Sequence, residues 1–200
     1  MKYLRTINAR DRRYCVVSGG HLPYWTDMAC GLEALPRMRE RGDEAAELHL
    51  QEAQGGLGLP DFVSNVHDLL VLRRSCAEAI LEAHDPGPHE VIPAVLINDK
   101  GRVHADDYVV LNPLGKVDCL DVLRSQMGGT PEHPWVRMGG RFCFDQARIP
   151  AGRDVFRVEM IAAGYAISDR LAAFIDERAF TNFVLADVLS TPTMGDGLRP

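Results

Sequence analysis

The side chain with the most evident capacity for chemistry is Cys119, which stands between Asp118 and Asp121. A thiol hydrolase would also need a general base and an acidic residue to orient it, and geometry rather than sequence order defines such a triad. Candidates for these two roles are His104, His133, Asp106 and Asp107. Acidic neighbours disfavour the reactive thiolate, however. The sequence therefore predicts a packed core thiol and no catalytic residue, with a Cys119 hydrolase as the enzymatic alternative.

Other patterns associated with metal or cofactor chemistry are missing from the sequence. The seven histidines and five cysteines show neither HxxxH nor Cys-x-x-Cys spacing. The glycines at positions 55, 56 and 58 lack the GxGxxG or Gly-Lys-Ser/Thr pattern of a phosphate-binding loop. Adjacent residues of a strand face opposite sides, so Asp106 and Asp107 are not expected to act as an acid–base pair. We predict no metal and no cofactor.

Aromatic residues in Pro/Gly-rich segments are the features best suited to binding. Tyr24 and Trp25 lie in a segment predicted to be a loop, and Trp135 follows a Gly/Pro-rich run that begins at Met127. Trp and Tyr are over-represented among interface hot spots. The alternative is that these rings fold back over the core. The predicted partner-binding residues are Tyr24, Trp25, Asp106, Asp107, Glu132, His133 and Trp135.

The net charge of −6 is unevenly distributed. Residues 1–13 carry five basic side chains against one acidic side chain, so the rest of the chain sums to −10. An acidic body argues against direct binding of nucleic acid, because phosphate binding needs a basic face. It suits a basic protein partner, although mild acidity also serves solubility alone.

Composition indicates an ordinary globular chain in a reducing compartment. Hydrophobic residues make up 46% and charged residues 25% of the sequence. The five cysteines are an odd number without close pairs, no secretory signal follows Met1, and no apolar run reaches membrane-spanning length. We therefore expect a cytoplasmic protein that does not bind a membrane; self-association remains open.

The element pattern predicts an α+β fold. Residues 108–111 read as a buried strand, residues 112–115 as a tight turn, and residues 117–122 as the returning strand of a hairpin. Residues 47–51 alternate polar and apolar side chains like a half-exposed strand. Residues 91–97 read as a strand in which Pro93 indicates an edge or a bulge. A strand at 69–72 leads into a helix capped by Ser75, and a strand at 165–167 leads into a helix that ends near Arg178. These patterns predict a mostly antiparallel sheet with two strand–helix units packed on it.

Three segments carry a family resemblance. The string NPLGKVDCLD at residues 112–121, with Ser125 behind it, resembles a hallmark of the eleventh catalogued immunity family of bacterial polymorphic-toxin systems, formerly a domain of unknown function. Residues 59–62, ahead of the strand at 69–71, and residues 149–157, ahead of 167–171, fit the same pattern. The resemblance covers residues 57–185. It divides the chain into a variable portion 1–56, a family-like core 57–190 that is expected to be continuous with it, and a tail 191–200.

The resemblance implies an immunity protein that binds and neutralises a cognate secreted toxin, such as one delivered by type VI secretion, without catalysis. The acidic body favours a basic, nuclease-like toxin. Two modes of neutralisation stay open, namely occlusion of the toxin's active site and binding at a distance from it. Besides the hydrolase, the remaining alternative is a regulatory or scaffold protein that self-associates through its apolar loops.

Overall fold

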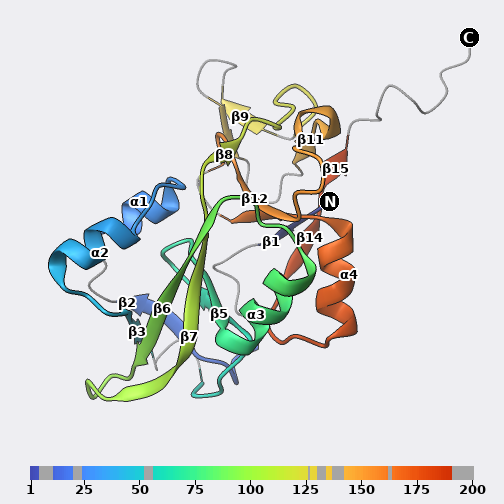
Figure 1. Ribbon diagram of the computed structural model, residues 1–200. Coiled ribbons are helices and arrows are strands. Elements are labelled where there is room, and N and C mark those ends of the chain that lie inside the picture. The colour runs from blue at the N-terminus through green and yellow to red at the C-terminus, as the bar shows by residue number, and fades with distance from the viewer. Residues whose placement is uncertain are drawn as a thin grey trace, which may run out of the picture.

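The computed structural model describes residues 1–4, 11–19, 24–51, 56–125, 127–129, 134–136, 142–161 and 164–190 (Figure 1). Its largest unit is a closed six-stranded barrel. In order around the barrel, the strands are β2 (Val16–Gly19), β3 (Ala46–Leu50), β6 (His89–Ile97), β7 (Val103–Pro113), β5 (Leu70–Arg73) and β4 (Phe62–Asn65). Closure leaves these six strands without an open sheet edge.

Side chains that alternate along the strands fill the barrel. On β3, Leu48 is buried whereas Glu47 and His49 are exposed, which confirms the half-exposed strand predicted there. Two short helices close one end of the barrel: α1 (Trp25–Ala29) and α2 (Leu35–Arg41). Their Met28 and Met38 join the same buried cluster as the inward residues of the strands. The end that these helices close is therefore a packed end and not an open pore.

A second, open sheet lies beside the barrel. Its strands, in order, are β14 (Leu185–Asp187), β1 (Lys2–Leu4), β13 (Tyr165–Ile167), β12 (Val155–Val158) and β8 (Lys116–Val117). Two amphipathic helices, α3 (Arg74–Ala83) and α4 (Asp169–Glu177), share a buried cluster with this sheet and with the outer face of the barrel. The remaining elements are short: β9 (Met127–Gly129) pairs with β10 (Pro134–Val136), β11 (Cys143–Phe144) pairs with β15 (Leu189–Ser190), and a 3₁₀ turn spans Gln146–Arg148.

The predicted α+β class fits this architecture, but the prediction of a single, mostly antiparallel sheet was wrong. The two strand–helix units are present as β5–α3 and β13–α4, yet their strands belong to different sheets. Parallel pairs join β2 to β4, β3 to β6 and β8 to β12. These pairs connect segments that are distant in sequence, and local alternation of polar and apolar residues does not specify such partners.

The hairpin predicted around residues 112–115 was also wrong. The strand at 108–111 is confirmed as part of β7, but β8 pairs in parallel with β12 rather than returning along β7. Asn112 does not close a turn with its side chain, because its amide Nδ2 donates to the carbonyl oxygen of Leu32 and to Glu90. The segment instead carries the chain out of the barrel and into the second sheet.

Pro93 lies within a strand that has neighbours on both sides, so β6 is not an edge strand. Its pairing with β3 begins at Ala94, opposite Ala46, one residue after the proline. On that side the proline therefore behaves as it would at an edge, since no ladder partner faces its missing N–H. A bulge does lie nearby, between Ala94 and Leu96, but its extra residue is on β7 and not on the strand that contains Pro93.

Helix boundaries were predicted better than helix caps. The second predicted helix is confirmed as α4, whose N-cap Ser168 accepts a hydrogen bond from the backbone N–H of Leu171. The Ser75 cap was wrong, because α3 already begins at Arg74 and has no side-chain cap. The segment expected to be a loop around Trp25 forms α1.

The chain before and after position 56 contributes strands to the same barrel and the same open sheet. The portion 1–56 supplies β1 to the open sheet and β2 and β3 to the barrel, as expected for one continuous domain. The tail 191–200 lies outside the described residues. Within the part of the chain that is described, no helix has the length and apolar character needed to cross a membrane.

Candidate functional site

Cys119 is fully buried, in a cluster with Phe144 and Phe156. Burial, followed by the nearby charge of Asp118, raises the pKa of its thiol to about 12. His104 lies at the far end of β7, where its Nε2 is 3.0 Å from the carbonyl oxygen of Leu57. His133, the other candidate base, lies outside the described residues. The structure therefore does not bring Cys119 and His104 together.

The cysteines give a direct test of this burial. All five are in described segments, and only Cys30 is exposed. We expect a chromogenic disulfide reagent at pH 8 to titrate one thiol rapidly in the native protein and all five in denaturant, because a buried thiol reacts only after opening. A Cys30→Ser variant should lose the rapid phase. Rapid labelling of a second thiol would contradict the packing described for Cys119.

The aromatic residues predicted to bind a partner differ in accessibility. Tyr24 is 2% exposed and belongs to the barrel core, so it has almost no surface to offer a partner. Trp25 is 43% exposed, and its ring centroid is 5.9 Å from that of His67. Trp135 lies in β10, opposite Gly128, whereas Glu132 lies, like His133, outside the described residues. Of this group, Trp25 alone is described as accessible.

Asp106 and Asp107 are both exposed, which corrects the expectation that they face opposite sides. Ala94 pairs with Tyr108 and Leu96 pairs with Ala105, so the single residue Val95 of β6 faces two residues of β7. Such a β-bulge inserts an extra residue and disturbs the alternation of sides. The Oδ2 atom of Asp107 is 3.9 Å from Nε of Arg73, and Asp106 forms no ion pair among the described residues.

This bulge lies on a solvent-exposed part of the barrel that we call the β6 face. The β6 face consists of Glu47 and His49 of β3, Val91, Pro93, Val95 and Ile97 of β6, and Val103, Asp106 and Asp107 of β7. The register joins these residues laterally, since Glu47 lies opposite Val95, His49 opposite Ile97, and Ile97 opposite Val103. The face therefore spans three adjacent strands.

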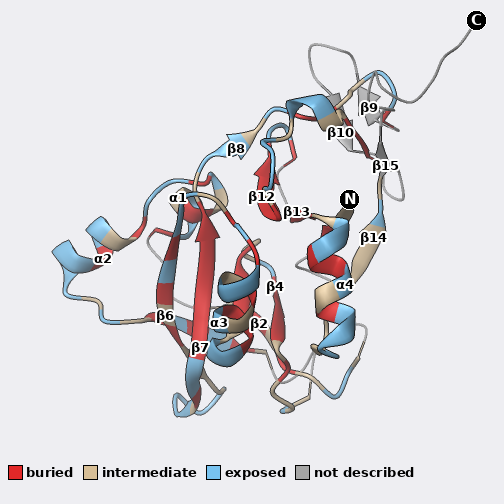
Figure 2. Ribbon diagram, turned by 45° about the vertical axis from the view of Figure 1, so that its right-hand side comes forward, coloured by how far each residue is buried: buried red, intermediate tan, exposed pale blue. Residues whose placement is uncertain are grey.

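The β6 face differs from the neighbouring barrel surface in what covers it. Further along β7, Val109 and Leu111 point outward but are buried in the cluster that contains α3 and α4. On β6, Val91 is 38% exposed, and Pro93, Val95 and Ile97 are half-buried. Figure 2 shows this contrast between the mostly buried β7 and the alternating burial of β6. An apolar stripe thus remains accessible, bordered by the carboxylates of Glu47 and Asp106.

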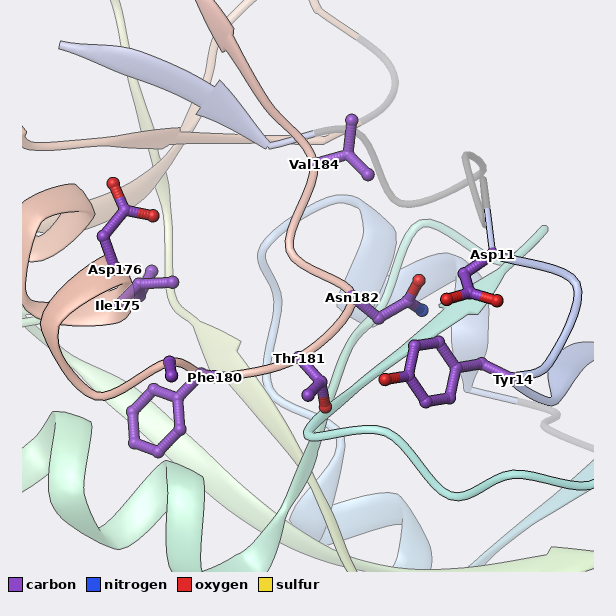
Figure 3. A pocket seen from close by; sticks show the side chains of 9 residues that line it. Asp11, Tyr14, Ile175, Asp176, Phe180, Thr181, Asn182 and Val184 are labelled. Atoms are coloured by element: carbon purple, nitrogen blue, oxygen red, sulfur yellow. The ribbon is translucent and has the colours of Figure 1, made fainter.

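A cleft of about 360 Å³ lies between residues 11–14 and the segment that follows α4 (Figure 3). Its carboxylates are at opposite ends, with Asp11 beside Tyr14 at one end and Asp176 at the other. Asp11 is held by Arg13, whose Nε lies 2.9 Å from Oδ2. This ion pair lowers the pKa of Asp11 to about 2. The Thr181 hydroxyl in this lining donates to the carboxylate of Asp61 at 2.8 Å, and reciprocal backbone hydrogen bonds between the same two residues make this a structural contact that joins the segment after α4 to the start of β4.

Sequence reasoning missed two buried carboxylates. Asp154 is 1% exposed and accepts hydrogen bonds from Arg170, Ser168 and the backbone of Asp85. Ser168 and His84 contact the same carboxylate instead of each other, so the group lacks the nucleophile–base contact of a hydrolase. Its hydrogen bonds hold the end of α3 and the start of α4 together.

Glu90 is the other buried carboxylate. It accepts hydrogen bonds from the backbone N–H groups of Ala34 and Leu35, at 2.8 and 3.0 Å, and from Nδ2 of Asn112. It therefore binds the first N–H groups of α2 from the side, in the place of an N-cap residue. The alternation of sides along β6 could have predicted that Glu90 is buried, because Glu90 faces the same inward side as Ile92 and Ala94.

No group of three or more His, Cys, Asp or Glu side chains suitable for a metal ion occurs among the described residues. The chain matches no protein-family model, and it matches no curated protein. The resemblance to the immunity family thus rests on the sequence motifs. Of the surfaces described, the β6 face combines exposed apolar side chains with unpaired charge, which are the properties of a protein-binding surface.

Proposed function

We propose that this protein is an immunity protein that binds a cognate secreted toxin and neutralises it without catalysis. The sequence motifs supply the class of function. The single observation that carries the proposal on the structural side is the β6 face, an accessible apolar stripe beside unpaired carboxylates. Apolar surface supplies affinity, and complementary charge accelerates association and selects the partner.

The charge of the β6 face supports a basic partner. Glu47 and Asp106 form no ion pairs within the described part of the chain, and the Asp107–Arg73 pair is long, at 3.9 Å. A basic partner would satisfy these carboxylates, as a nuclease-like toxin with a phosphate-binding surface would. The proposal therefore places binding on the β6 face and includes Asp106 and Asp107, which the sequence had already indicated.

The test begins with capture of the partner from the organism that encodes this protein. The tagged protein is used as bait, and each captured protein is then expressed alone and together with it. We expect a captured protein that arrests growth alone and is tolerated when this chain is present. Capture of no toxic protein, together with Cys119-dependent turnover of a thioester or peptide library, would overturn the proposal in favour of a hydrolase.

A substitution on the apolar stripe locates the binding surface. Val95→Arg places a positive charge at the centre of the β6 face, and we expect it to weaken binding of the captured toxin at least about 30-fold. The matched control is Leu123→Arg, because Leu123 is an exposed apolar residue outside this face. Affinity is measured by surface plasmon resonance. If Val95→Arg instead dissociates a homodimer, as seen by sedimentation, the scaffold alternative replaces the immunity function.

A further inference from the structure

The acidic residues of the β6 face lie on both sides of its apolar stripe. Val95 is opposite Glu47 on β3, and on its other side it faces the bulge that contains Asp106. Neighbouring strands are about 4.8 Å apart, so the two acidic positions are separated by about 10 Å across β6. Both carboxylates are exposed. The face therefore presents one apolar line with a negative charge at either border.

These dimensions match one α-helix. A helix with its side chains is about 10–12 Å wide, which is the spacing of the two acidic borders. The stripe from Val91 to Ile97 spans six strand steps of about 3.3 Å, or roughly 20 Å. At 1.5 Å per residue, a helix of about 13 residues covers that length.

An extended strand fits this surface less well. Its side chains would alternate between the face and the solvent, so residues to either side of its apolar row would point away from the carboxylates. A helix instead carries residues along both flanks of its apolar stripe, where Lys and Arg reach sideways. From Val91 to Ile97 the outward residues of β6 are Val, Pro, Val and Ile, which give a low ridge without long side chains in the path of a helix, and His89 lies beyond the Val91 end of this stripe.

We propose that the β6 face binds an amphipathic helix of the partner, about 13 residues long, whose apolar stripe is bordered on both sides by Lys or Arg. This inference names the contacting element of the partner and rests on the proposed function only for the identity of that partner. The apolar stripe of the helix packs on Val91, Val95 and Ile97. Its basic borders pair with Glu47 on one side and with Asp106 on the other.

The test uses labelled 14-residue peptides and needs no toxin. A Leu/Lys peptide with helical amphipathic spacing is compared by fluorescence anisotropy with a Leu/Glu analogue and with a scrambled Leu/Lys sequence. We expect the amphipathic Leu/Lys peptide to bind at least about tenfold more tightly than either comparison peptide. Both Val95→Arg and the double variant Glu47→Lys/Asp106→Lys should weaken its binding about tenfold or more.

The matched control is Glu78→Lys/Glu82→Lys, which makes the same change in net charge on the exposed side of α3. We expect this control to bind within about twofold of the unmodified protein. Equal weakening in both double variants, or equal binding of the scrambled peptide, would overturn the inference. A captured toxin that binds Val95→Arg as well as the unmodified protein would overturn it while leaving the immunity function standing. Specific binding of the amphipathic peptide without capture of a toxic partner would support the helix-binding face and overturn the immunity function.

Discussion

Replacing Asp154 with asparagine is expected to lower the free energy of unfolding by about 3 kcal/mol, because hydrogen bonds to a buried charge are strong and their donors would be left unsatisfied. Arg170 approaches Oδ2 at 2.5 Å, the Ser168 hydroxyl approaches Oδ1 at 2.5 Å, and the Asp85 backbone N–H donates at 3.1 Å. His84 also lies 3.2 Å from Oδ2. The asparagine amide keeps the shape of the side chain but adds an N–H group among these donors.

The pH dependence of this effect has a definite sign. Burial by itself would raise the pKa of Asp154, but the hydrogen bonds from Arg170, Ser168 and Asp85 together lower it below its ordinary value. A carboxylate whose pKa is lower in the folded state stabilises the protein above its unfolded pKa of about 3.9, and this stabilisation is lost as the pH falls through the folded pKa. The difference in the free energy of unfolding between the unmodified protein and Asp154→Asn should therefore be largest at pH 7 and become smaller below about pH 4.

Chemical denaturation at pH 7 and at pH 3.5 measures both effects. Glu177→Gln is the control, because Glu177 is an exposed carboxylate near the end of α4. We expect this control to unfold at the same denaturant concentration as the unmodified protein. If Asp154→Asn behaves like the control, the buried hydrogen bonds do not stabilise the junction between α3 and α4.

Local patterns in the sequence predicted several elements because those patterns suffice to define them. The alternation at Glu47, Leu48 and His49 is that of a half-exposed strand, and it holds in β3. Leu171 and Ile175 are spaced for one helical face, and both are buried in α4. Neither pattern identifies the distant strand or helix against which its element packs. The parallel pairing of β3 with β6 joins segments more than 40 residues apart, and the closed barrel depends on it.

The candidate site was only partly predictable for a related reason. The acidic pair Asp106–Asp107 was identified, but its exposure depends on a bulge that appears only when β7 is aligned with β6. Val95 looked like any other apolar strand residue, and nothing local shows that α3 covers Val109 of β7 but leaves Val95 accessible. Exposure of an apolar residue is a property of the packed elements around it, so a single sequence does not reveal this kind of binding surface.

The second large effect is expected at Glu90, which joins the barrel to the helices at its end. Replacing Glu90 with alanine removes the acceptor for two backbone N–H groups at the start of α2 and for the amide of Asn112. Glu90 is 8% exposed, so water replaces these bonds poorly. We expect the free energy of unfolding to fall by about 3 kcal/mol, since unsatisfied buried donors each cost about 1–3 kcal/mol. Glu82→Gln, an exposed change on α3, serves as the control.

Hydrogen exchange separates local from global consequences of this change. The helix α2 is seven residues long and cannot persist alone, so loss of its Glu90 contact should release it before the barrel opens. The amide of Met38, which donates to the carbonyl of Ala34, should exchange at least about 30-fold faster in Glu90→Ala. Amides of β7 exchange only on global unfolding, so their exchange in Glu90→Ala should be faster only by the factor that corresponds to the loss in the free energy of unfolding. Unchanged exchange at Met38 would show that Met38 packing, rather than Glu90, anchors α2 to the barrel.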